Sequence, residues 1–139
     1  MNLKEILTVS GKKSLYKLVS KGKSNMIVES LLDGSRMPVF ASTHAGTLAD
    51  ISIFTESKDM LLKDVFKCIY DMENGNNTID VSTAKPIEIE SYMEKVVPDY
   101  DRDKVHISDM KKIFFWYNQL LEHNILSFNV EGEDAQKEG

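Results

Sequence analysis

Hydrophobic and polar side chains alternate along the chain between Leu15 and Thr55. Short runs rich in β-branched and aromatic residues follow this period of two, and turn residues separate most of them. The runs are Leu15–Ser20, Met26–Leu32, Met37–Ala41 and Ile51–Thr55. The pattern predicts a four-stranded antiparallel meander with a tight turn at Asp33-Gly34. Pro38 lacks an amide donor, so we expect its strand at a sheet edge or the proline at the first strand position.

Beyond Ser57 the apolar residues recur with a period of 3.6, which is typical of helices packed on one side. Three helices are predicted: about Lys58–Glu73, from Pro86 to just before Pro98, and from a Ser108 cap to about His123. Asn74-Gly75 offers a left-handed end to the first of them.

Two shorter patterns flank these elements. Leu3, Ile6 and Leu7 have helical spacing behind Asn2, which predicts one short helical turn that plugs the sheet. Alternation at residues 126, 128 and 130 predicts a brief closing strand, and the polar residues 131–139 have the composition of a disordered tail.

The change of period predicts an α+β fold. We expect an N-terminal antiparallel small barrel or curled sheet of SH3-like size, followed by a three-helix C-terminal part packed on it. The expected boundaries are 1–56 for the β-rich subdomain, 57–130 for the helical subdomain and 131–139 for the tail. A sheet of that size buries too little of its own surface to be stable alone, so the helices should cover part of it.

Composition limits where the protein works. Cys68 is the only cysteine, which precludes an intrachain disulfide and favours a reducing compartment. The first residues lack the apolar region of a signal peptide, and the longest apolar run, Ile113–Tyr117, is far shorter than the ~20 residues of a membrane span. We therefore expect a cytoplasmic protein with no membrane partner.

The net charge of −5 is unevenly distributed, because residues 1–40 carry +4 and the remainder −9. Basic side chains surround one tyrosine at the first predicted hairpin. They are Lys12, Lys13, Lys17, Lys21 and Lys23, with Tyr16 among them. A basic sheet bearing an aromatic ring is typical of single-strand binding. Alternatively, these lysines are a solvated face, and the two halves of the chain attract each other when packed.

The third predicted helix carries two aromatic residues outside its main apolar stripe. At 100° per residue, Phe115 lies nearly opposite the stripe and Trp116 flanks it. The neighbours expected around Phe115 are Lys111, Lys112, Gln119 and Glu122. Either this helix is buried on two sides within the monomer, or Phe115 and Trp116 form a contact with a partner protein or a second copy.

Residues with catalytic or metal-binding chemistry are scattered. The three histidines fall in separate segments, and Cys68 adjoins an apolar stripe where a buried, inert thiol is usual. The run Asp99–Asp103 opens like a calcium loop, but Lys104 and Met110 occupy the positions that need glycine and glutamate. We therefore predict no catalytic residues, no metal site and no cofactor; a composite enzyme site between the halves is a third hypothesis.

Several runs resemble an uncharacterised bacterial family catalogued as a domain of unknown function. The matching runs are Asn2–Leu7, Val9–Lys12, Tyr16–Val19, Ile27–Leu31, Pro38–Ala41, Asp50–Ile53, Val97–Arg102, Ser108-Asp109, Lys111-Lys112, Trp116–Asn118 and Leu120-Leu121. The resemblance implies a small β-barrel-like part joined to a helical part, and it carries no activity.

Taken together, these patterns favour a non-enzymatic protein-interaction or adaptor protein. The partner is then an unknown protein or a second copy of the chain, held through Phe115 and Trp116. The alternative is nucleic-acid binding, of RNA in particular, through the basic hairpin. The loose spacing of the lysines does not favour this alternative.

Overall fold

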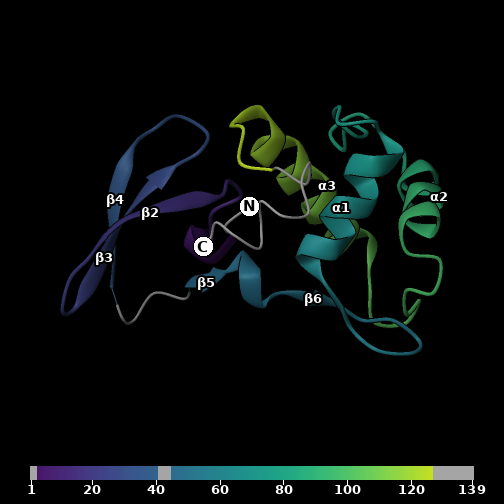
Figure 1. Cartoon of the computed structure of the whole chain (residues 1–139), viewed down its shortest axis with the longest axis horizontal. Coiled ribbons are helices and arrows are strands. Elements are labelled where there is room, and N and C mark those ends of the chain that lie inside the picture. Colours follow the sequence, from purple (N-terminus) through teal and green to yellow (C-terminus); the bar gives the residue numbers. More distant parts are fainter. Residues whose placement is uncertain (1–2, 41–44, 127–139) are drawn as a thin grey trace, which may run out of the picture.

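The computed structural model describes residues 3–40 and 45–126. Figure 1 shows β2, β3 and β4 at one end of the molecule and three helices at the other, with β6 beneath the helices. The strands are β1 (Ile6–Val9), β2 (Tyr16–Lys21), β3 (Asn25–Ser30), β4 (Arg36–Phe40), β5 (Ala45–Thr47), β6 (Ser52–Ile53) and β7 (Met60–Leu61). The helices are the 3-10 turns η1 (Leu3–Glu5) and η2 (Leu48–Asp50) and the α-helices α1 (Leu62–Met72), α2 (Pro86–Val96) and α3 (Ile107–Glu122).

Five strands form one antiparallel sheet in the order β4-β3-β2-β1-β5. The sheet is curled and open, so the curled-sheet form of the prediction is confirmed and a closed barrel is not formed. Pro38 lies opposite Ile27 in β4, which is an edge strand, as its missing amide donor predicts. The register shifts between Leu18 and Ser20, where β2 bulges.

The predicted helical turn near the N-terminus is only partly correct. η1 ends at Glu5, and Ile6 begins β1, a strand that pairs with both β2 and β5. Ile6 and Leu7 therefore point to opposite sides of the sheet, and each is buried in a different hydrophobic cluster. Three apolar positions at this spacing suit both a helical turn and a short strand, so the sequence alone did not separate them.

The predicted strand Ile51–Thr55 does not join the main sheet, which is a second correction. Within it, Ser52 and Ile53 form β6, which pairs only with β7 in a separate two-stranded sheet. β7 occupies residues expected to be the start of the first helix, so α1 begins at Leu62. In the main sheet, β1 lies next to β2, and β5 lies next to β1. Both strands are too short to show an alternation of apolar and polar residues in the sequence.

The ends of the helices follow local hydrogen bonding. After α1, Asn74 and Gly75 adopt φ of 55° and 82°, and the Gly75 amide donates to the Tyr70 carbonyl at 2.9 Å, which is the left-handed end that was predicted. α3 begins one residue before the predicted cap, Ser108. Its N-cap is His106, whose amide donates to the Asp109 carboxylate at 3.0 Å.

Two hydrophobic clusters stabilise the fold. The sheet cluster consists of Leu7, Val9, Tyr16, Val28 and Val39. The much larger helical cluster includes the buried faces of α1, α2 and α3 together with six residues from the N-terminal part, 1–56. These six are Leu3, Ile6, Leu15, Leu31, Leu48 and Ile53. The three-helix part is therefore packed on the sheet part, as predicted.

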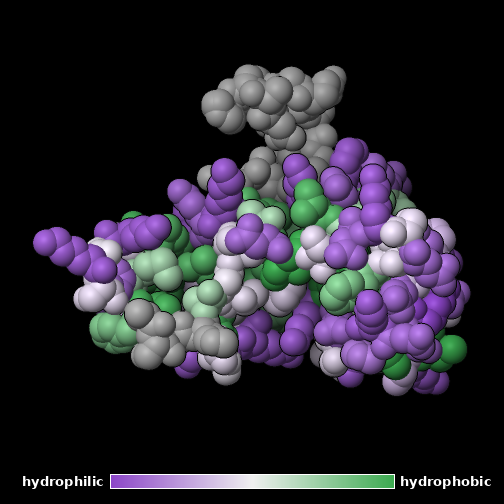
Figure 2. Space-filling model, turned by 90° about the horizontal axis from the view of Figure 1, so that it is seen from below, coloured by the Kyte–Doolittle hydropathy of each residue, from purple (hydrophilic) through white to green (hydrophobic). Residues whose placement is uncertain are grey.

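The surface differs between the two ends. On the face shown in Figure 2, hydrophilic side chains cover most of the helical end, whereas apolar side chains surface toward the middle and the sheet end. In the described part of the chain, none of the helices combines the length and the apolar character needed to cross a membrane.

Candidate anion-binding cleft

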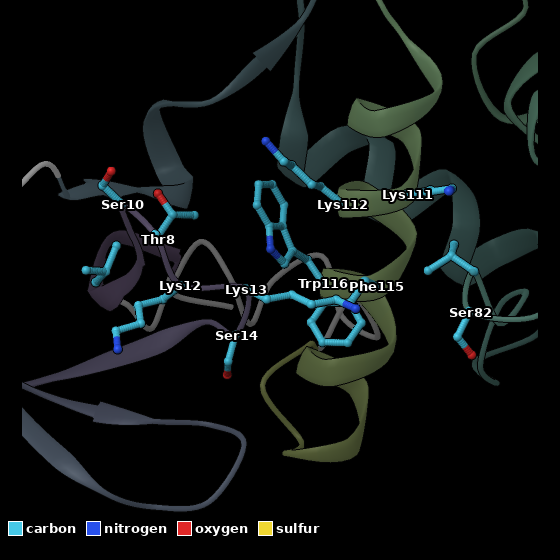
Figure 3. A pocket seen from close by; sticks show the side chains of 13 residues that line it. Thr8, Ser10, Lys12, Lys13, Ser14, Ser82, Lys111, Lys112, Phe115 and Trp116 are labelled. Carbon is cyan, nitrogen blue, oxygen red and sulfur yellow. The ribbon is translucent and has the colours of Figure 1, made fainter.

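A cleft of about 730 Å³ opens between the β1–β2 loop and α3 (Figure 3). Residues from three separate segments line it: β1 with the loop that follows, the connection between α1 and α2, and the middle of α3. The lining residues are Thr8, Val9, Ser10, Gly11, Lys12, Lys13, Ser14, Val81, Ser82, Lys111, Lys112, Phe115 and Trp116. Both sets of candidate residues singled out in the sequence therefore contribute to one site.

The β1–β2 loop has a defined geometry on its side of the cleft. Gly11 has a φ of 83°, which favours glycine, and the Lys12 amide donates to the Val9 carbonyl at 2.9 Å. This turn carries Lys12 and Lys13 on exposed positions immediately before the buried Ser14.

Gln119 of α3 holds the far end of this loop. The Leu15 amide donates to its Oε1 at 2.9 Å, and its Nε2 donates to Ser14 Oγ at 3.1 Å. Gln119, which the sequence places only among the neighbours of Phe115 away from the apolar stripe, is 6% exposed. A buried amide that satisfies a backbone donor and a hydroxyl fixes the position of the loop relative to α3.

On the α3 side, two adjacent lysines lie one helical turn before two adjacent aromatic residues. Lys111 precedes Phe115 by four residues, and Lys112 precedes Trp116 by four, a spacing that places each pair on the same helix side. The Lys13 ammonium lies 5.0 Å from the centroid of the Phe115 ring, within the range of a cation–π interaction. Figure 3 shows Lys13 reaching across from the loop and Trp116 lying between α3 and the loop.

Phe115 and Trp116 are both half-buried. Trp116 packs in part against the helical cluster, and both rings also line the cleft. The prediction that these two residues contact a partner remains a prediction.

The charge of the cleft is one-sided. Four of its lining residues are lysines, and the described lining includes no carboxylate. Across residues 3–40 and 45–126, none of these four ammonium groups forms an ion pair. Hydroxyl groups of Thr8, Ser10, Ser14 and Ser82 also line the cleft. A concave surface of one sign concentrates the electric field, so this cleft attracts anions even in a protein of net charge −5.

A second hollow of about 220 Å³ adjoins the cleft, sharing Lys112 and Trp116 with it. Phe54, Lys104 and the acidic Asp109 are among its other lining residues, with the Lys104 ammonium 5.2 Å from the centroid of the Phe54 ring. Two lysine–aromatic contacts, Lys13 with Phe115 and Lys104 with Phe54, thus flank Lys112 and Trp116, which line both hollows without contacting each other as a cation–π pair. We call these six residues the lysine–aromatic track.

The other residues of the predicted basic hairpin lie outside the cleft lining. Lys17 pairs across the strands with Glu29, which accepts from Arg36 Nε at 3.0 Å, whereas Lys21 pairs with Met26. Positions 26 and 29 of one strand point to opposite faces, so these two lysines do not share a surface.

Tyr16 and Lys23 also lie away from the cleft. Lys23 is exposed in the β2–β3 turn, whereas Tyr16 is 7% exposed within the sheet cluster. The Tyr16 ring is therefore not presented for stacking on a base. Of the predicted polyanion-binding set, the structure brings Lys12 and Lys13 together with the α3 lysines and separates the rest.

The remaining candidates have structural roles. Cys68 is half-buried on α1, where burial, and next the carboxylates of Asp71 and Asp64, raise the pKa of its thiol. The Asp101 carboxylate accepts the amide protons of Asp103 and Lys104, so it stabilises the turn before α3. His106 and His123 cap the two ends of α3.

Two further observations concern the metal prediction. Within the described ranges, no group of three or more His, Cys, Asp or Glu side chains is arranged to hold a metal ion. His44 lies outside the described residues.

Sequence reasoning missed several lining residues, above all Lys111, Lys112 and Lys104. The sequence analysis named the two α3 lysines only as neighbours of Phe115, although the repeated Lys-to-aromatic spacing of four residues was a usable signal. Phe54 and Lys104 are fifty residues apart in the chain, and no local pattern connects them.

The fold and the cleft define an α+β protein in which a curled antiparallel sheet and a three-helix part share a basic, aromatic cleft. The chain belongs to the family described as a domain of unknown function (DUF6852), whose model matches residues 51–120. Residues 3–46 match the model of a second domain of unknown function (DUF5606). The resemblance to an uncharacterised family drawn from the sequence is therefore confirmed.

A solved structure supports the same assignment. The chain is similar to a protein from Bacteroides vulgatus, a structural genomics target determined by solution NMR, with 39% sequence identity over 91% of each chain and a TM-score of 0.74. No curated protein matches the chain significantly.

Proposed function

We propose that this protein acts by binding, as a non-enzymatic interaction or adaptor protein of the cytoplasm, and that the cleft between the β1–β2 loop and α3 receives an anionic partner. The observation that carries the proposal is the gathering of four lysines around two aromatic rings with no carboxylate among the described lining residues. The lone cysteine supports the cytoplasmic setting.

Electrostatics favours an occupant of negative charge. Lys12 and Lys13 belong to one segment and Lys111 and Lys112 to another, so packing the loop on α3 adds their positive charges to one cleft. The attraction of these charges for an anion is modest in water but grows where the surrounding protein lowers the effective dielectric constant.

The size and make-up of the cleft suit a short segment or a ligand of similar size. Its volume of about 730 Å³ falls within the ~300–1,000 Å³ range of ordinary binding pockets. On the loop side the Ser10 hydroxyl can donate to an anionic oxygen, whereas those of Thr8 and Ser14 already donate to backbone carbonyls. The rings of Phe115 and Trp116 offer an apolar surface. The occupant therefore combines negative charge with an apolar or planar group.

The test is a pair of charge-reversal variants with the same net charge. Lys111→Glu/Lys112→Glu alters the cleft, whereas Lys63→Glu/Lys95→Glu alters exposed lysines of α1 and α2. With inorganic polyphosphate as the probe, measured by isothermal titration calorimetry, we expect the cleft variant to lose at least about tenfold in affinity and the control to stay within about twofold. An equal loss in both variants would show attraction to net charge alone and would contradict the proposal.

A further inference from the structure

We propose that the anionic partner is single-stranded nucleic acid, with a base stacked on Trp116 and the phosphates along the lysines of the lysine–aromatic track. This inference rests on the proposed function of the cleft and specifies the occupant. Alternation of basic side chains with aromatic rings along a groove is the arrangement by which proteins hold single strands, since every base has a π-face and every linkage a phosphate.

The two adjoining hollows define a path for an extended ligand. They meet at Lys112 and Trp116, which line both of them, so a segment that runs from one hollow into the other passes the indole ring. An extended chain uses both hollows, whereas a small isolated anion needs only one.

The three rings of the track are not equivalent. The Lys13 ammonium lies 5.0 Å from the centroid of the Phe115 ring, and the Lys104 ammonium lies 5.2 Å from the centroid of the Phe54 ring. Within the described part of the chain, no cation lies over Trp116. Phe115 and Phe54 therefore act as positioning residues that hold two lysines at the ends of the track, and Trp116 is the ring left to stack on a base.

Stacking separates this ligand from an acidic peptide. A run of carboxylates can pair with the lysines but offers the indole no π-surface, so the aromatic rings would then add little. A duplex keeps its bases stacked inside, where Trp116 cannot reach them without unpairing. Among the described residues, lysines that form no ion pair, together with an indole ring that no cation covers, thus fit a single-stranded nucleic acid best.

The single tryptophan of the chain makes the stack directly observable, because all indole fluorescence comes from Trp116. The probes are a ten-nucleotide oligouridylate, an abasic oligonucleotide of equal length and charge, and a decaglutamate peptide. We expect oligouridylate to quench Trp116 and to bind at least about fivefold more tightly than the abasic strand, as expected for one stacked base. The logarithm of its affinity should fall with the logarithm of the salt concentration with a slope of about −2 to −3.

The outcomes separate the two proposals. Equal binding of the abasic strand without quenching, or decaglutamate binding as tightly as oligouridylate, overturns the assignment to nucleic acid and leaves an anion-binding cleft. Failure of all three probes and of polyphosphate overturns the proposed function itself.

A variant gives an independent check on the stack. Trp116→Leu keeps an apolar side chain at the half-buried position, and we expect it to retain the salt slope while losing the preference for oligouridylate over the abasic strand. If the preference persists in the folded variant, the stack on Trp116 is refuted. If the variant does not fold, the abasic comparison in the unmodified protein decides.

Discussion

The sheet and the helical part of this molecule are stabilised very unequally. Among the described residues, the sheet cluster has five buried members, whereas the helical cluster has 22, six of which come from the N-terminal part. Ile6 and Leu7, adjacent in β1, divide between the two clusters. The comparison teaches that the sheet depends on the helical part for its stability, and that the two are joined where β1 and its loop meet α3.

That junction is also where the candidate site lies. The loop supplies one side of the cleft and α3 the other, and Gln119 fixes their relative position through Leu15 and Ser14. Stability and binding therefore depend on the same contact, and the predictions below test the unequal roles of the two regions.

The largest effect is expected in the helical cluster. Phe114 is fully buried and meets Tyr92 edge-on with ring centroids 5.2 Å apart. Phe114→Ala should lower the free energy of unfolding by about 3–5 kcal/mol and unfold the sheet and the helices in one transition, measured by circular dichroism in urea. Phe54→Ala, at a ring 46% exposed, is the matched control, with a loss expected to be about 1 kcal/mol or less.

A smaller and more local effect is expected in the sheet cluster. Val28 is fully buried, and Val28→Ala should cost about 1–3 kcal/mol. Hydrogen exchange should accelerate for amides of β2, β3 and β4 while α1 and α3 keep their protection. Val19→Ala, at a position 41% exposed on β2, should change little. Equal acceleration in the helices would show that the sheet does not open independently.

The junction itself can be weakened without touching either cluster. Gln119→Met keeps the side-chain size but leaves the Leu15 amide without its acceptor, at a cost of about 1–3 kcal/mol. Glu122→Met, at an exposed position on the same helix, is the control. Urea unfolding followed through Trp116 fluorescence measures both. If the two variants unfold alike, the Gln119 hydrogen bonds do not hold the loop.

The smallest effect concerns pH and is confined to the helical part. Burial, and next the negative charges of Glu73, Tyr70 and Asp71, raise the pKa of Tyr117 from 10 to about 12. The folded protein then holds this proton where the unfolded chain releases it, so stability is full below pH 10 and falls as pH rises from about 10 to 12.

Urea midpoints at pH 8, 10 and 11 measure this dependence. Tyr117→Phe, which also loses the hydrogen bond from the phenol to the Asn76 carbonyl, should show a shallower decline. The decline should not vanish, because burial and the hydrogen bond to Glu73 also raise the pKa of Tyr92. An identical pH dependence in the variant and the parent would contradict the role assigned to Tyr117.

Much of this fold could be predicted from local periodicity. The strands β2, β3 and β4 and all three α-helices follow periods that a short window reveals, and the edge position of Pro38 follows from its missing donor. The same period of two could have predicted that Tyr16 is buried, because Tyr16 lies on the same strand face as the apolar Leu18 and on the opposite face from Lys17. Brief elements such as β1 and β5 span too few residues to display a period.

The site was harder to predict because it is made by tertiary packing. Gln119 is polar, and its burial depends on a backbone donor 104 residues earlier in the chain. Lys12 and Lys13 likewise meet Lys111 and Lys112 only after the loop packs on α3. Sequence reasoning therefore identified some cleft residues in the loop and others in α3, and no local pattern showed that the two segments form one site.

The central claim is that the loop and α3 form one binding site. The most direct test is a titration of the isotope-labelled protein with polyphosphate, followed by amide chemical shifts. We predict that the signals of residues 10–14 and 111–116 shift together with one dissociation constant, while those of β3, β4 and α2 stay in place. Shifts in only one of the two segments, or shifts spread evenly over exposed lysines, would contradict the account.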